Sequence, residues 1–182
     1  KGFDVMCGNP PWDKLQMEEE KWFAGKDEDI VKAANQAERK ERIAKLQTTA
    51  PKLYEEFTIA CNALTSQSNF VKNSGRFHLT AVGKLELSSL FAELCLSFSK
   101  EARGLVLPTG IAVNDSNKYF FSELIDENRL VSLYDFENRE KLFEIDSRFK
   151  FCLITAGKAQ TEPRTVSGGF YLTCLTLDVS IR

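Results

Sequence analysis

Residues 3–12, Phe-Asp-Val-Met-Cys-Gly-Asn-Pro-Pro-Trp, decide the fold of this chain. Residues 3–7 form a short apolar run, which predicts a β-strand that ends at Gly8. Pro10 and Pro11 exclude both a helix and the hydrogen-bonded ladder of a sheet. Residues 9–12 are therefore predicted to form a stiff loop at the C-terminal end of a strand.

Downstream of this loop, predicted helices and strands alternate. Helices are expected at 84–100 and 117–128, and strands at 104–107, 130–136, 149–155 and 169–177. This order indicates an α/β protein with a three-layer, mostly parallel sheet. Ligands of such sheets bind beyond the C-terminal ends of the strands, where the 9–12 loop is expected.

Residues 13–72 separate the first strand from the rest and are predicted to be a charged, helical insertion, interrupted at Pro51. The stretch from Asp27 to Leu46 has apolar residues at helical spacing. Its basic residues suit either contacts with DNA phosphates or an ordinary solvated face, and the interleaved Glu38 and Glu41 favour the solvated face. The basic residues are Lys32, Arg39, Lys40, Arg42 and Lys45.

The composition is that of a globular domain. The chain has 182 residues, of which 43% are hydrophobic and 27% charged, enough for one domain with a sizeable core. No apolar run is long enough to span a bilayer. Because the chain lacks an initiator Met and starts within a predicted strand, we expect it to be a piece of a longer protein. Its net charge of −2 implies that, if it acts on DNA, much of the affinity for DNA comes from other parts of the parent protein.

The cysteines indicate neither a zinc site nor a disulfide framework. They are scattered, odd in number and never spaced as C-x-x-C, which suits the cytoplasm of a prokaryote. Cys7, Cys95 and Cys152 lie in apolar runs and are predicted to be small core residues. His78, the single histidine, has no partner pattern, so no metal is expected.

The 9–12 loop is the part of the sequence that indicates a catalytic or binding function. Two prolines fix its backbone, so the Pro10 carbonyl and the Asn9 side-chain amide keep a set direction. Two such acceptors hold the hydrogens of an exocyclic amine and stabilise positive charge that develops on its nitrogen. Trp12 adds a flat face on which a nucleobase stacks, worth about 1–3 kcal/mol.

The sequence from Phe3 to Trp12 resembles the catalytic motif of the amino-methyltransferases that methylate adenine N6 in DNA. Further segments agree with the large restriction–modification and phage-defence members of that family, in the same order. They are 83–87 with 90–94, 103–110, 136–138 with 142–143, and 148–151. The resemblance implies an incomplete Rossmann-like methyltransferase fold and an adenine-specific DNA methyltransferase as the parent protein.

This resemblance also implies roles for single residues. Asn9 and Pro10 would hold the amine, with Pro11 fixing the loop, and Trp12 would stack on an adenine flipped out of double-stranded DNA. A late aromatic residue would pack on the other side of the base. Phe149 and Phe151 both qualify, since alternate residues of a strand face the same way, and one of the pair is expected to be core.

S-adenosyl-L-methionine (AdoMet) is the methyl donor that the resemblance implies. The family's glycine-rich turn does not occur in this chain. Only Asp4 is a candidate for contact with the donor, and a polar strand-end residue explains it equally well. We expect an AdoMet-binding segment and a target-recognition domain elsewhere in the same parent chain, and the isolated chain to be inactive.

Two alternatives remain open at this stage. One is an N5-methyltransferase of protein glutamine, because a primary amide uses the same acceptors, although those enzymes generally carry Tyr after the prolines. The other is a non-catalytic module for DNA recognition or assembly, which the missing donor half favours.

Overall fold

The computed structural model describes residues 2–173. The chain divides into two compact units, which are described separately. The sheet unit comprises Lys1–Lys14 and Gly75–Arg182, and the helical unit comprises Leu15–Ser74.

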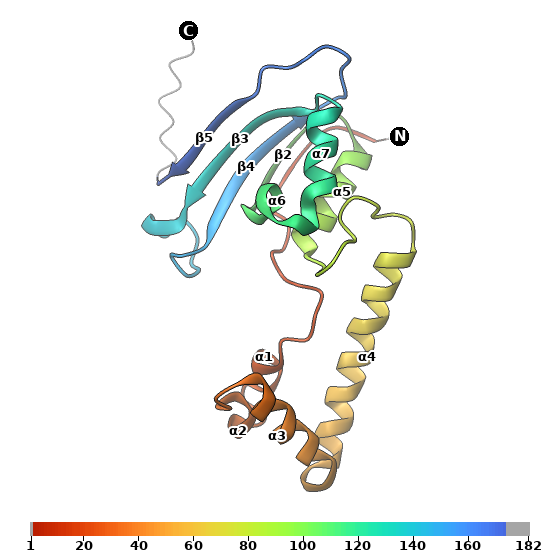
Figure 1. The fold of residues 1–182 in the computed structure, drawn as a ribbon, viewed down its shortest axis with the longest axis vertical. Coiled ribbons are helices and arrows are strands. Elements are labelled where there is room, and N and C mark those ends of the chain that lie inside the picture. The colour runs from red at the N-terminus through yellow and green to blue at the C-terminus, as the bar shows by residue number, and fades with distance from the viewer. Residues whose placement is uncertain (1, 174–182) are drawn as a thin grey trace. The chain divides into compact units, whose positions relative to one another are not determined.

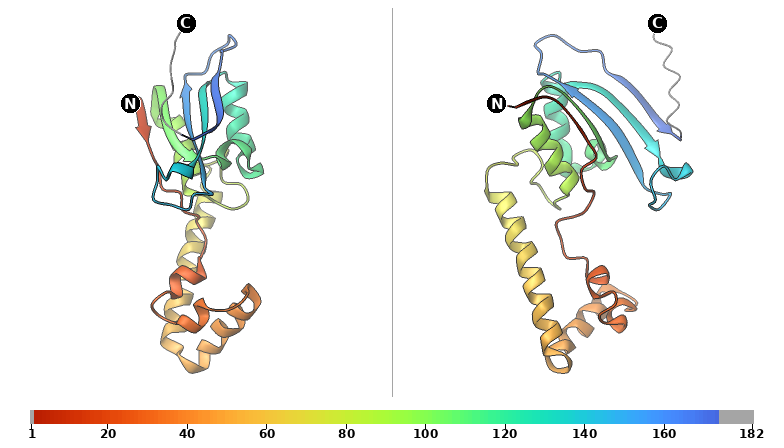
Figure 2. Two further views of the ribbon diagram at one scale, coloured as in Figure 1. Left: turned by 90° about the vertical axis from the view of Figure 1, so that its left-hand side faces the viewer. Right: turned by 180° about the vertical axis from the view of Figure 1, so that it is seen from behind.

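The sheet unit contains a five-stranded sheet in the order β1-β2-β4-β3-β5, so the α/β class is confirmed. Figure 1 shows the strands side by side, and Figure 2 shows the same sheet from two further directions. The bounds are β1 Phe3–Gly8, β2 Ser99–Pro108, β3 Leu130–Glu137, β4 Lys150–Gly157 and β5 Ser167–Leu172.

This sheet is mixed, where the sequence predicted mostly parallel strands. β1 pairs with β2 and β3 with β5 in parallel, whereas β4 runs antiparallel to both of its neighbours. The reason lies in residues 138–149, which join β3 to β4 without an α-helix. A parallel pairing usually needs a helical crossover of a dozen or more residues, whereas this connection contains only a 3₁₀ turn and returns the chain as an antiparallel neighbour.

One face of the sheet is covered by helices α5 (Leu87–Phe98), α6 (Gly110–Val113) and α7 (Lys118–Asp126), as Figure 1 shows. A single core joins them to the strands. It includes Ala92 and Cys95 of α5, Phe120 and Leu124 of α7, and Leu107 of β2. Helices and strands of this core occur close to where the sequence places them, because their apolar periodicity records burial on one side.

The opposite face of the sheet carries no helix among the described residues. Val106 and Leu153 lie on it and are half-buried. At the end of this face beside the 138–149 connection, Phe136 of β3 and Phe151 of β4 pair in register and are fully buried. The aromatic residues of the candidate site collect there.

The helical unit consists of α1 (Glu19–Phe23), α2 (Glu28–Val31), α3 (Gln36–Thr49) and α4 (Pro51–Asn73). The periodic stretch from Asp27 to Leu46 is broken, since Asn35 caps α3 by accepting a hydrogen bond from the Glu38 N–H. Pro51 begins α4 at a position that needs no N–H donor. The core of this unit consists of Phe23, Ile30, Ile43, Leu46 and Phe57.

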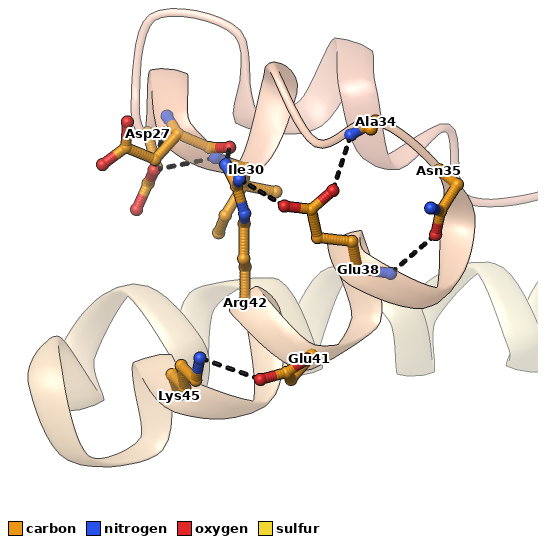
Figure 3. A network of polar contacts seen from close by, with 9 residues as sticks. Asp27, Ile30, Ala34, Asn35, Glu38, Glu41, Arg42 and Lys45 are labelled. Atoms are coloured by element: carbon orange, nitrogen blue, oxygen red, sulfur yellow. Dashed lines mark hydrogen bonds and ion pairs between the residues drawn. The ribbon is translucent and has the colours of Figure 1, made fainter.

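Basic residues of the helical unit bind carboxylates of the same unit. Arg42 contacts Glu38 at 2.5 Å and Lys45 contacts Glu41 at 2.9 Å, both one helical turn apart (Figure 3). Arg39 contacts Glu20 at 2.5 Å. These pairings neutralise Arg39, Arg42 and Lys45, as is usual on a solvated helix face, whereas Lys32 and Lys40 form no ion pair within the described residues.

The cysteines divide between core and surface. Cys95 and Cys152 are buried, as predicted, whereas Cys7 is exposed because it lies on the edge strand β1, on the face without helices. Cys174 and residues 174–177 of the last predicted strand lie outside the described residues. Within residues 2–173 there is no cluster of metal ligands and no helix long and apolar enough to cross a membrane.

Candidate functional site

The loop at Asn9–Trp12 is held at both ends. Upstream, β1 pairs with β2 as far as Gly8, opposite Leu105. Downstream, the Asp13 carbonyl accepts a hydrogen bond from the N–H of Leu87 at 2.9 Å. This bond satisfies one of the free N–H groups at the start of α5. Together with the two prolines, these anchors fix the direction of the loop.

A hollow of about 320 Å³ lies beside this loop. It is lined by Asn9, Pro10, Pro11, Trp12, Phe143 and Ile145. Its lining is apolar apart from Asn9 and backbone atoms, and none of these residues carries a titratable side chain. The hollow is therefore suited to bind and orient a flat, partly apolar group, and it offers no side-chain acid or base.

Asn9 is the polar side chain of the hollow. It is exposed, and its amide makes no hydrogen bond to any residue in the described part of the chain. An amide that is free in this way keeps its oxygen available as an acceptor and its NH₂ as a donor. Asn9 is therefore available to form hydrogen bonds with polar atoms of a ligand.

Four aromatic rings form a cluster at the hollow, and two of them, Trp12 and Phe143, line it. Phe136 and Phe151 stack with centroids 5.2 Å apart and planes 9° apart. Trp12 lies over Phe151 at 6.4 Å and 29°, and Phe143 contacts Trp12 edge-on at 5.4 Å. Aromatic pairs at such separations attract beyond their simple burial. The cluster holds the Trp12 ring in one orientation.

Trp12 carries a polar atom without a partner. Its indole Nε1–H is buried and donates no hydrogen bond to any described residue. A buried unpaired donor costs about 1–3 kcal/mol, and such exceptions require an explanation in a native structure.

The structure separates the two late aromatic candidates. Phe151 is 2% exposed and packs under Trp12, whereas Phe149 is 57% exposed. They do not share a face of one strand, because β4 begins at Lys150. Phe149 lines a different hollow of about 520 Å³, together with Pro108, Thr109 and Lys150.

Sequence reasoning missed Phe143 and Ile145, which form the wall of the hollow opposite the loop. Both lie in the 138–149 connection, among charged residues and outside any periodic element. The available signal was their apolar character in an otherwise charged loop, since exposed loops rarely need such residues.

Asp4, the candidate for contact with a methyl donor, is exposed in β1. It is the second residue of the strand, so it lies near the end opposite to Asn9. At the usual rise of a strand, five residues correspond to roughly 16 Å. The structure does not bring Asp4 and Asn9 together.

Charged groups close to the hollow are paired with one another. Glu137 contacts both Lys150, at 3.0 Å, and Arg139. The hydrogen bond from Lys150, together with the nearby charge of Arg139, lowers the pKa of Glu137. Hydrogen bonds from Arg148 lower the pKa of Asp146 to about 2. Both carboxylates are ionised at neutral pH, and their lowered pKa values make them weak proton acceptors.

No model of a known protein family matches the chain, and no curated protein matches it either. Solved structures show partial likeness. A protein from Listeria monocytogenes, described as a class I S-adenosylmethionine-dependent methyltransferase, is 18% identical with a TM-score of 0.42. The match covers 55% of this chain and 32% of that one.

Two restriction–modification proteins are also similar. A nuclease-deletion mutant of the type ISP enzyme LlaGI, solved with a DNA substrate mimic, is 15% identical with a TM-score of 0.45. That match covers 93% of this chain and 15% of LlaGI. The methyltransferase subunit of a type I system from Streptococcus thermophilus is 18% identical with a TM-score of 0.36, over 52% of this chain and 20% of that one. Backbone likeness of this degree carries no information about single side chains, so their roles follow from the hollow itself.

Proposed function

We propose that this chain forms the target-base half of the active site of a DNA adenine-N6 methyltransferase of the restriction–modification or phage-defence type. The observation that carries the proposal is the hollow at Asn9–Trp12. It combines a free amide, a proline-fixed backbone and an indole face at the end of a strand.

The proposed binding mode follows from these groups. An adenine extruded from the duplex lies on Trp12, because stacking on an aromatic ring offsets the cost of leaving the helix. Its exocyclic amine donates its two hydrogens to the Asn9 side-chain oxygen and the Pro10 carbonyl. These bonds orient the nitrogen lone pair away from the loop, toward the donor.

In the proposed reaction, the N6 lone pair would receive the methyl group that AdoMet supplies, and the thioether would be the leaving group. Positive charge appears on N6, and one N–H proton is then lost. Two fixed acceptors stabilise that charge without reorganising, which is the largest contribution that a site of this kind makes. No residue that lines the hollow is titratable, so none of them is assigned as the acceptor of this proton.

AdoMet supplies the methyl group as an electrophilic sulfonium. Residues of the hollow do not form its binding site, because they include no carboxylate for the ribose hydroxyls and no glycine-rich turn. The donor site belongs to another part of the proposed enzyme, and no step through AdoMet is assigned to the described residues.

The proposed partner is double-stranded DNA. Since the chain has a net charge of −2 and pairs many of its basic side chains internally, most phosphate contacts are assigned to other parts of the full-length protein. In this proposal the chain binds and orients the target nucleobase, and other parts of the protein supply most of the non-specific affinity for DNA.

The test uses the full-length protein, duplex DNA and AdoMet labelled on its methyl group. After digestion of the DNA to nucleosides, we expect the label in N6-methyladenine. Label in cytosine, label on protein glutamine, or no transfer at all would each contradict the proposal.

A further inference from the structure

Asn138 links the end of β3 to the wall of the candidate site. It begins the short 3₁₀ turn η2 (Asn138–Glu140) and is fully buried, at 0% exposure. A buried primary amide is costly unless its hydrogen bonds are satisfied. The partners that it has therefore indicate what the residue does.

All the side-chain hydrogen bonds of Asn138 go to the wall of the hollow. Its Nδ2 donates to the carbonyls of Phe143, at 3.0 Å, and of Ile145, at 3.3 Å. Its Oδ1 accepts the N–H of Phe143 at 3.0 Å. Phe143 and Ile145 are the two residues that face the Asn9–Trp12 loop across the hollow.

The rest of the connection provides little anchoring. Within residues 139–149, all side chains except Phe143 are exposed. Lys141 has a left-handed backbone with φ 50°, which a non-glycine residue adopts at some cost. Such a charged, exposed loop has few buried apolar contacts that would hold it in one conformation.

We infer that Asn138 is a positioning residue that holds Phe143 and Ile145 as the second wall of the base-binding hollow. This role rests on the proposed function. Asn138 does not touch the base. It fixes the loop so that the Phe143 ring meets Trp12 at 5.4 Å and supports the stacking surface. Asparagine suits the position because it donates to two carbonyls and accepts from one N–H, whereas aspartate only accepts.

Asn138→Asp in the full-length protein is the central variant. It keeps the side-chain size and the acceptor for the Phe143 N–H, and it removes both donated bonds. Asn117→Asp is the matched control, since Asn117 is also buried and donates one bond, to the Gly110 carbonyl at 3.0 Å on the other face of the sheet. Phe143→Ala removes the ring that forms the wall, and it is the second test variant in case Asn138→Asp does not fold.

Two readouts separate positioning from general stability. Amide hydrogen exchange of peptides covering residues 138–149 should become at least tenfold faster in Asn138→Asp and stay unchanged in Asn117→Asp. Duplex DNA with 2-aminopurine at the target position reports base extrusion without methyl transfer. Asn138→Asp and Phe143→Ala should still bind this DNA, with the fluorescence increase reduced severalfold.

The outcomes distinguish this inference from the proposed function. If the wild-type protein methylates adenine while Asn138→Asp matches it in both exchange and 2-aminopurine fluorescence, the inference is wrong and the function stands. Loss of DNA binding equal to the loss of fluorescence also overturns it. If the wild-type protein neither methylates nor extrudes a base, the proposed function fails first.

Discussion

The indole of Trp12 lies over the ring of Phe151, with centroids 6.4 Å apart and planes 29° apart, although 138 residues lie between them in the sequence. Phe151 in turn stacks on Phe136. The core of the sheet thus supports the ring that is proposed to receive a base.

Trp12 should contribute to catalysis through its flat face. Trp12→Leu removes the aromatic surface, and we expect kcat/KM for DNA to fall by about 10- to 100-fold, since stacking is worth about 1–3 kcal/mol per base. Trp12→Phe keeps an aromatic face and should retain most of the activity. Steady-state methylation kinetics check this, and equal losses in the two variants would contradict it.

Asn9 should act on the transition state without supporting the fold. Asn9→Ala should lower kcat by about 10²- to 10³-fold, the usual loss when one fixed hydrogen-bonding group is removed from developing charge. Because Asn9 is exposed and has no hydrogen bond within the described residues, the unfolding free energy should change by no more than about 0.5 kcal/mol. Asn62→Ala, also exposed, is the matched control on α4 and should change neither quantity.

Phe149 and Phe151 should differ sharply in their effect on stability. Phe151→Ala should cost about 3–5 kcal/mol of unfolding free energy, because it empties a fully buried position. Phe149→Ala should cost less than about 0.5 kcal/mol, as expected for an exposed side chain. Denaturant unfolding measures both, and similar losses at the two positions would count against the packing described here.

The cysteine thiols provide a prediction on pH. Burial, with the nearby charge of Asp135, raises the pKa of Cys152 to about 12 from an ordinary value near 9. The folded protein therefore holds the thiol proton more tightly than the unfolded chain. The contribution of the neutral thiol to stability is complete below about pH 9 and is lost as the pH rises toward 12.

Alkylation at pH 8 tests the same assignment directly. In the native protein, iodoacetamide should label the exposed Cys7 and leave Cys152 unmodified, since the thiolate is the reactive form. Peptide mapping by mass spectrometry reads the result. Labelling of Cys152 at a rate similar to that of Cys7 would show that the thiol is not buried as described.

Much of the sheet unit could be predicted from the sequence. The helix around Leu90 and the strand around Leu105 follow from apolar periodicity, and Pro10 and Pro11 place the loop at the end of β1. The direction of β4 was not predicted, because strand pairing is decided by the length of a connection and by long-range contacts that periodicity does not record.

The candidate site was predicted in part. The loop residues are marked by a motif whose backbone constraints can be derived from two prolines. Asn138 and Phe143 lie in segments of the family resemblance, but no site role was predicted for them or for Ile145, because their roles depend on how the 138–149 connection folds back toward Trp12. Hydrogen bonds from one buried amide to two loop carbonyls leave no periodic signal in a sequence.

The central claim is that Trp12 receives an extruded adenine, and photo-crosslinking tests it most directly. In DNA that carries 5-iodouracil in place of the target adenine, ultraviolet light joins the extruded base to the aromatic ring on which it stacks. With the full-length protein, the account predicts that peptide mapping finds the crosslink at Trp12. A crosslink at Phe149, or at a residue outside the hollow, would contradict it.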